Sequence, residues 1–340
     1  MLPANPEHNG IRDDLARHRP PCQHAGMTIA LWSSDDWRRE AEAWLDGQLA
    51  ARGIRRTGEV TQPHLRPWAT VLRAPTTRGV VWLKAAGPQT AFEVELYRLL
   101  EQVVPERILR PLASDARRGW IVLPDGGVRL GDLLDDLDLA EAMFEVLPRY
   151  GELQRSLEPH VEELLELGLA DMRAAVMPRR FEEALAAVRG HVGRHGTEGD
   201  RETLRRAAAM AGRFQGWCER LGGAAVGASL DHNDLHLWNV FVDPGAGPGT
   251  VGRVRFYDWG DSVVAHPFAS MLLGLRMIRL QLKVAADDPA VTRPRDAYLE
   301  VFGDLASHRE LLEELELACR VGEALRALES LLSESAIVAV

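Results

Sequence analysis

The chain has 340 residues, of which 46% are hydrophobic, and a formal net charge of −10. This length and composition predict a folded protein with two domains or lobes and exclude wholesale disorder. The acidic balance argues against a dedicated nucleic-acid binder, which needs a basic surface. No apolar run reaches the roughly 18 residues that a membrane-spanning helix needs, so we expect no membrane span.

Cysteine and lysine usage narrows the class of protein further. The three cysteines, Cys22, Cys218 and Cys319, lie far apart and form no C-x-x-C pair. This argues against a disulfide framework and a cysteine zinc site, and we expect a cytoplasmic protein. Only two of the 40 basic residues are lysine, Lys84 and Lys283. Because lysine and arginine are not interchangeable chemically, each lysine is a candidate for a specific role.

The N-terminal segment, residues 1–26, contains several prolines and glycines and shows no apolar periodicity. We expect a disordered extension, or a segment translated ahead of a start at Met27. It lacks the apolar core of a signal peptide. Ser34 then predicts the start of a helix that Gly53 ends. The apolar face of this helix is expected to hold Trp37, Ala41, Trp44 and Leu45.

The region 27–124 is predicted to form an α+β lobe. Apolar runs separated by Pro, Thr and Gly predict a five-stranded antiparallel sheet. The strands are expected at 58–64, 67–75, 79–86, 111–115 and 119–124. Between the third and fourth strands, an apolar stripe predicts one helix over 90–104, which Pro105 ends.

The rest of the chain is predicted to be a larger, mainly helical lobe. A Gly-rich break predicts a hinge at 125–131, and the helical lobe then covers 132–340. Apolar periodicity predicts helices at 130–157, 159–176, 178–195, 200–221, 266–286, 294–304 and 307–333. A strand-like island at 227–258 interrupts them.

The polar residues of this island are the strongest candidates for chemistry. Asp234 and Asn239 lie between apolar flanks, and Asp258 follows a second strand-like segment. Each segment places a carboxylate at a turn, so the two segments side by side would bring the three residues together. Magnesium takes oxygen ligands, usually one or two carboxylates plus substrate phosphates, which suits Asn239 and Asp258. Asp234 is then free to accept a proton from an attacking hydroxyl.

Phosphoryl transfer also needs a cation on the nucleotide phosphates, and Lys84 is the candidate. It ends the predicted strand 79–86, and the next helix offers Glu93 and Glu95 as acidic partners. Glu93 shares the inward apolar stripe of this helix, whereas Glu95 lies nearer its edge. We therefore prefer Glu93 as the partner of Lys84.

Two motifs resemble those of a known family. The run His232–Asn239 has the form H-x-D-x-x-x-x-N and resembles the catalytic motif of aminoglycoside phosphotransferases and choline-kinase-like small-molecule kinases. Tyr257, Asp258 and Trp259 resemble the I-D-W or I-D-F segment that binds metal in that family. The resemblance covers roughly residues 58–330. It implies a two-lobed protein-kinase-like fold with ATP bound in the cleft.

The same resemblance implies a role for each candidate residue. In the nucleotide site, Lys84 would hold the α- and β-phosphates of ATP and Glu93 would pair with Lys84. In the catalytic loop, Asp234 would be the catalytic base or orient the hydroxyl, and His232 would support the loop. Asn239 and Asp258 would bind Mg²⁺. The backbone of the hinge would pair with adenine at Val122, Leu123, Pro124 and Asp125.

The sequence also departs from this family. The usual G-D-P after the metal-binding aspartate is Ala265, His266 and Pro267 here, and the aspartate of the following D-L-A is Ser270. The turn expected over the phosphates, residues 66–70, has no glycine. The H-R-D, D-F-G and A-P-E motifs of protein kinases are absent, and neither lysine has the glycine spacing of a P-loop.

The function these features predict is magnesium-dependent transfer of the ATP γ-phosphate to a hydroxyl of a small molecule. The acceptor is an aminoglycoside, a related antibiotic or an amino sugar; a sugar or a choline- or homoserine-like alcohol also fits. The acidic stretch 131–166 would attract a cationic acceptor, or is simply a set of solvated helix faces. The sequence indicates no oligomeric state.

The sequence also allows two hypotheses from other functional classes. A nucleotide-binding pseudokinase is supported only by the altered segment 265–271. A metallohydrolase would use the alternating residues His232, Asp234 and His236 as ligands of zinc or iron. The metallohydrolase reading leaves Lys84 and Asn239 without a role.

Overall fold

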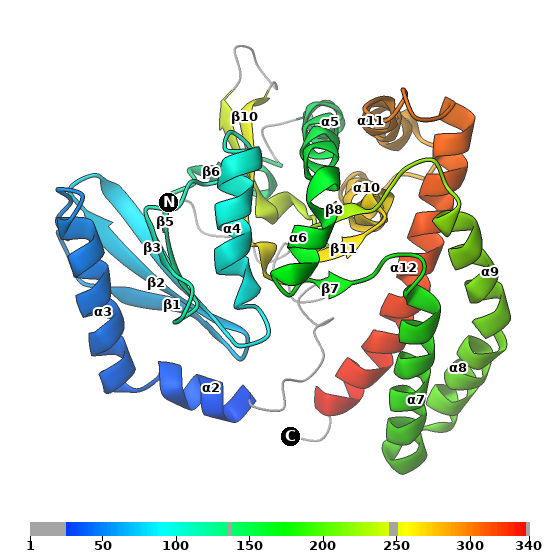
Figure 1. Cartoon of the computed structure of the whole chain (residues 1–340), viewed down its shortest axis with the longest axis horizontal. Coiled ribbons are helices and arrows are strands. Elements are labelled where there is room, and N and C mark those ends of the chain that lie inside the picture. The colour runs from blue at the N-terminus through cyan, green and yellow to red at the C-terminus, as the bar shows by residue number, and fades with distance from the viewer. Residues whose placement is uncertain (1–24, 135–137, 245–250, 338–340) are drawn as a thin grey trace. The chain divides into compact units, whose positions relative to one another are not determined.

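The computed structural model describes residues 25–134, 138–244 and 251–337 (Figure 1). It divides into two compact units. The larger unit contains His24–Asp171 and Ala225–Leu312, and the smaller unit contains Met172–Ala224 and Glu313–Val340. Residues 1–24 of the predicted extension 1–26 lie outside the described residues. Its last two residues were predicted wrongly, because helix α2 (Ala25–Trp32) begins at Ala25.

A five-stranded antiparallel sheet forms the first part of the larger unit, as predicted. Its strand order is β1-β2-β3-β5-β4. The strands are β1 (Thr61–Arg66), β2 (Ala69–Thr76), β3 (Gly79–Ala86), β4 (Ala113–Asp115) and β5 (Trp120–Pro124). Helix α4 (Phe92–Val103) connects β3 to β4.

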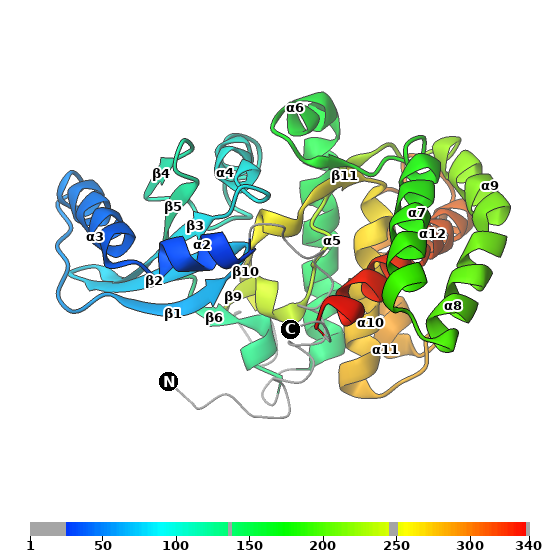
Figure 2. The same ribbon diagram turned by 90° about the horizontal axis from the view of Figure 1, so that it is seen from below.

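One face of this sheet is covered by α2 and α3 (Asp35–Ala50) (Figure 2). The Ser34 side chain caps α3 by accepting the Trp37 N–H, as its position in the sequence predicts. Alternate residues of β3, including Leu83 and Ala85, belong to the core under these helices. Because successive side chains of a strand point to opposite faces, Lys84 lies on the other face of the sheet.

The remainder of the larger unit combines helices with two small sheets. One sheet has the order β10-β9-β6 and the other β7-β11-β8. Their strands are β6 (Val128–Arg129), β7 (Ala170–Asp171), β8 (Ser229–Asp231), β9 (Val240–Pro244), β10 (Val251–Phe256) and β11 (Val263–Ala265). The helices are α5 (Leu139–Leu157), α6 (Val161–Glu166), α10 (Met271–Leu282) and α11 (Pro289–Glu300), with α5 packed against α11.

The smaller unit is helical. Its helices are α7 (Met177–His195), α8 (Glu198–Ala209), α9 (Ala211–Gly222) and most of α12 (His308–Ile337). Phe181 of α7 stacks on Phe214 of α9 with ring centroids 4.2 Å apart. No helix of the described ranges is long and apolar enough to cross a membrane.

Several predicted helix boundaries are wrong, each for a local reason. The predicted helix 130–157 begins only at Leu139, where Asp138 caps α5. The predicted helix 159–176 ends at Glu166, because Gly168 adopts φ +97° and the chain then joins strand β7. The predicted helix 200–221 is two helices that meet at Met210. The predicted helix 266–286 ends where Lys283 turns left-handed.

Gly131 and Gly47 differ in the space available for an added methyl group, so replacing each by alanine tests this packing. A Cβ on Gly131 would lie 2.5 Å from the buried Trp238 ring, whereas a Cβ on Gly47 of α3 meets nothing within 4 Å. We expect Gly131→Ala to lower the free energy of unfolding by about 1–3 kcal/mol through overpacking. Gly47→Ala is expected to raise it by about 0.5–1 kcal/mol, since alanine favours the helix. Urea unfolding measures both; equal shifts in the two variants would contradict the packing described.

Candidate active site

The loop after β8 carries the first group of candidate residues, His232–Asn239. The side-chain Nδ2 of Asn239 donates to the main-chain carbonyl of Asp234 at 3.0 Å and to its Oδ2 at 3.3 Å. His236 Nε2 lies 3.5 Å from the same Oδ2. The Asp234 side chain is 24% exposed, so its carboxylate is oriented from within the loop and still accessible to a substrate.

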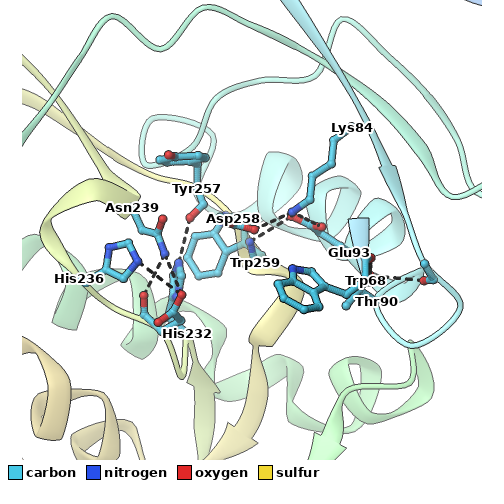
Figure 3. A network of polar contacts seen from close by, with 12 residues as sticks. Trp68, Lys84, Thr90, Glu93, His232, His236, Asn239, Tyr257, Asp258 and Trp259 are labelled. Carbon is cyan, nitrogen blue, oxygen red and sulfur yellow. Dashed lines mark hydrogen bonds and ion pairs between the residues drawn. The ribbon is translucent and has the colours of Figure 1, made fainter. Parts of the chain in front are cut away.

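Lys84 joins the sheet to the second group of candidate residues (Figure 3). Its Nζ donates to Glu93 Oε1 at 2.7 Å and to Asp258 Oδ1 at 2.6 Å. Glu93 is 1% exposed and also accepts the Trp259 N–H at 3.1 Å. Burial lowers the pKa of Lys84, but the Asp258 and Glu93 carboxylates outweigh it and hold the pKa above its usual value. The ammonium is therefore charged and fixed in place.

The structure places Glu93, and not Glu95, against Lys84. Glu95 instead pairs with Arg98 on the exposed side of α4, at 2.8 Å. The two glutamates differ by two positions on a helix and so face different directions. The inward apolar stripe of α4 therefore carries Glu93 to the Lys84 side chain.

Asp258 has an unusual backbone for a residue other than glycine. Its φ is +65°, in the left-handed region, at the start of the short 3-10 turn Trp259–Asp261. Such conformations cost free energy and persist where the surrounding structure imposes them. Here the turn aims a side chain that is 39% exposed at Lys84 while the next residue contacts Glu93.

His232 is completely buried and connects the two groups. Its Nε2–H donates to the Tyr257 carbonyl at 3.0 Å, and its ring lies 4.7 Å from that of Trp259. It therefore ties the Asp234 loop to the segment that carries Asp258. Burial lowers the pKa of His232, although the Tyr257 carbonyl and nearby carboxylates act in the opposite direction.

This lowered pKa predicts a pH-dependent stability. His232 stays neutral in the folded chain while the unfolded chain takes up a proton below about pH 6.5. We therefore expect the stability contributed by His232 to be present above that pH and to be lost as the pH falls. Urea unfolding between pH 5 and 8 measures the slope. His232→Gln should make it shallower; an unchanged slope would contradict the assignment.

The turn between β1 and β2 is fixed to the loop between β3 and α4. The Trp68 carbonyl accepts the Gly87 N–H at 2.7 Å and the Thr90 hydroxyl at 3.0 Å (Figure 3). A Cβ on Gly87 would lie 2.9 Å from the Trp68 oxygen, so this contact requires glycine. We did not predict from the sequence that Gly87 and Thr90 support this turn, because both lie outside it, in the segment after β3.

The predicted hinge residues lie at the end of β5. The Val122 carbonyl accepts the Leu112 N–H at 2.7 Å, and the Asp125 N–H donates to the Val80 carbonyl at 3.1 Å. The Val122 carbonyl and the Asp125 N–H are therefore already hydrogen-bonded within the protein. Because bonding groups alternate along an antiparallel strand, the Pro124 carbonyl points to the same side as that of Val122, away from β3.

Two sequence-based ideas lose support in the structure. His232, Asp234 and His236 do not form a metal-binding group, and the described ranges contain no cluster of three or more His, Cys, Asp or Glu suited to a metal. Part of the acidic stretch 131–166 is paired with arginine. The ion pairs include Arg129–Asp132, Arg293–Glu141, Arg149–Glu145 and Arg107–Glu152.

Comparison with known proteins identifies the fold. Macrolide 2'-phosphotransferase MphH from Brachybacterium faecium matches with a TM-score of 0.50 over 85% of this chain and 93% of that protein, at 15% identity. Choline kinase LicA from Streptococcus pneumoniae gives 0.50 over 86% and 90%, at 14% identity. The GDP complex of an aminoglycoside 2'-phosphotransferase-IIIa mutant gives 0.50 over 84% and 89%, at 13% identity.

These neighbours share the two-lobed protein-kinase-like fold, which is therefore the fold of this chain, as predicted. All three are named as phosphotransferases or kinases of small molecules. No protein-family model and no curated protein sequence matches the chain. At such low identities the likeness establishes the fold, and the activity has to be argued from the site.

Proposed function

We propose that this protein transfers the γ-phosphate of ATP to a hydroxyl group of a small molecule, with Mg²⁺ as the metal. One observation carries the proposal. Lys84 Nζ, which also donates to Glu93, lies 2.6 Å from Asp258 Oδ1. The hydrogen bond from His232 to the Tyr257 carbonyl connects the Asp258 segment to the loop that contains Asp234 and Asn239. A fixed cation, an exposed carboxylate and a second oriented carboxylate are the parts that phosphoryl transfer needs.

In this proposal Lys84 binds the α- and β-phosphates of ATP and Glu93 keeps its ammonium in position. The adenine would pair with two neighbouring backbone groups, the Pro124 carbonyl and the Gly126 N–H, because the Val122 carbonyl and the Asp125 N–H are already hydrogen-bonded within the protein. One acceptor and one donor match the amino group and ring nitrogen of adenine. The phenyl ring of Phe241 lies against the Gly126 backbone, and its centroid is 4.5 Å from that of the tilted Tyr257 ring, which offers an apolar surface for the base.

The donor chemistry of the site suits magnesium. Nδ2 of Asn239 donates to Asp234, so Oδ1 of Asn239 is the atom that could coordinate a cation. Asp258 supplies a partly exposed carboxylate. Hard oxygen ligands in this number, completed by substrate phosphates, are typical of magnesium. Asn239 and Asp258 would hold the ion, and bound Mg²⁺ would neutralise charge on the phosphate oxygens.

Asp234 would act on the acceptor. Its carboxylate is oriented by Asn239 and His236 and remains accessible, so it can accept a hydrogen bond from the attacking hydroxyl. It would align that hydroxyl and take its proton as the bond to phosphorus forms. Positioning then supplies most of the rate enhancement, since the protein forms no covalent bond in this reaction.

For the acceptor we propose an aminoglycoside, a related antibiotic or an amino sugar. The support is the motif resemblance together with two neighbours named for antibiotic phosphorylation. A choline-like alcohol is the second candidate, supported by the choline kinase neighbour.

The test is transfer from γ-labelled ATP to a panel of aminoglycosides, macrolides, amino sugars and amino alcohols, with and without Mg²⁺. We expect label on at least one panel compound only when Mg²⁺ is present. ATP binding without transfer to any compound, or to water, would favour the pseudokinase reading. Absence of ATP binding would contradict the proposal altogether.

A further inference from the structure

A buried polar network of Asp231, Ser270 and Tyr150 contacts the backbone of the Asp234 loop. Asp231 is 3% exposed at the end of β8. Its Oδ1 accepts the Asn233 N–H at 2.8 Å and also the hydroxyl of the buried Ser270. The carboxylate therefore contacts both the loop and the segment that follows β11.

The hydroxyl groups of this network have one consistent direction. Ser270 donates its proton to Asp231, so its oxygen accepts the hydroxyl of Tyr150 at 2.7 Å. The Tyr150 oxygen is then available to accept the His232 N–H at 3.0 Å and the Gln154 amide at 3.3 Å. Burial raises the pKa of Tyr150, and the nearby Asp231 raises it further, so Tyr150 remains a donor.

Through this chain Asp231 fixes two successive loop amides, those of His232 and Asn233. Asn233 needs such support because its φ is +59°, a left-handed conformation that costs free energy in a residue other than glycine. The next residue is Asp234. The direction of the Asp234 side chain therefore depends on a carboxylate three positions earlier in the sequence.

We propose that Asp231 is the positioning residue of the catalytic loop. Asp231 of β8 and Ser270 of the 3-10 turn Pro267–Ser270 together supply the support that one carboxylate at position 270 would give. This inference rests on the proposed function for its catalytic consequence. The geometry fits it, since Ser270 is the position where the sequence departs from the family pattern and its hydroxyl reaches Asp231. A buried carboxylate is costly without hydrogen bonds, and Oδ1 of Asp231 accepts two.

Three variants test the proposal, with Ser229→Ala as the control. Asp231→Ala removes the acceptor for both donors, Asp231→Asn keeps an acceptor oxygen, and the exchange Asp231→Ser with Ser270→Asp moves the carboxylate to position 270. Ser229 is equally buried in β8, and its hydroxyl donates to the Gln154 carbonyl at 2.6 Å without touching the loop amides. It controls for the loss of a buried hydrogen bond.

Hydrogen exchange of the loop amides and steady-state kinetics are the two readouts. We expect Asp231→Ala to speed exchange at His232 and Asn233 and to lower kcat by about 100-fold, with KM for ATP unchanged. Asp231→Asn and the exchange variant should recover much of both. Ser229→Ala should lower the melting temperature without changing kcat.

Either of two results would overturn the proposal: unchanged exchange of the loop amides in Asp231→Ala, or a kcat that falls equally in Ser229→Ala. Hydrogen exchange needs no substrate. If the wild-type chain transfers no phosphate, the proposed function fails while exchange still shows whether Asp231 holds the loop.

Discussion

Replacement of Asp234 by asparagine is expected to lower the rate of phosphoryl transfer by about 10²–10⁴-fold, the usual contribution of a positioned base. Asparagine keeps the size of the side chain and an oxygen that can bond Asn239, so the loop should stay folded. ATP affinity should therefore be retained, since Asp234 is proposed to act on the acceptor. Single-turnover kinetics together with ATP titration measure both quantities.

Asp287→Asn is the matched control for this substitution. Asp287 is exposed at the end of the α10–α11 connection, and its replacement makes the same change in net charge. It should transfer phosphate at the wild-type rate. Equal activity of Asp234→Asn and Asp287→Asn would show that Asp234 takes no part in the reaction. Positioning of the substrates alone would then account for the rate enhancement.

Replacement of Lys84 by methionine is expected to abolish detectable ATP binding and to lower the free energy of unfolding by about 3 kcal/mol. The second effect follows because Glu93, 1% exposed, would lose the cation that neutralises it. Calorimetric titration with ATP and urea unfolding measure the two effects. Adding Glu93→Gln should restore much of the stability, since the buried charge is then gone, but none of the binding.

Lys283→Met is the control, because Lys283 is the only other lysine of the chain and is exposed. It should bind ATP with wild-type affinity and unfold at the wild-type urea concentration. If Lys84→Met bound ATP as tightly as Lys283→Met does, the phosphate-binding role proposed for Lys84 would be wrong.

Local signals in the sequence account for the parts of the fold that were predicted correctly. Strand β3 was predicted with both of its ends, because Gly79 begins it and the apolar run ends near Gly87. The Ser34 cap and the Glu93 stripe are likewise readable from neighbouring residues. The α+β class of region 27–124 followed from five strands and one inserted helix, whereas the protein-kinase-like fold was predicted from the resemblance of two motifs.

The errors arise where distant contacts decide the structure. Residues 170–171 become a strand because β11, more than 90 positions later, pairs with them. The hydrogen bond from the Asp125 N–H to the Val80 carbonyl cannot be predicted from neighbouring residues, because it forms only when β3 and β5 pair. Asp231 reads as one more polar residue of the loop until Ser270 and Tyr150 lie beside it. Periodicity along the chain carries no information on such pairs.

Titration of the wild-type chain with ATP, with and without Mg²⁺, tests directly whether the site binds a nucleotide together with a metal. We expect binding that Mg²⁺ strengthens, because the phosphates need Lys84 and the metal would draw Asp258 away from the 2.6 Å ion pair that Asp258 forms with Lys84. Replacing Asp258 by asparagine should remove the dependence on Mg²⁺. Failure of ATP to bind at any Mg²⁺ concentration would contradict the proposed phosphotransferase activity.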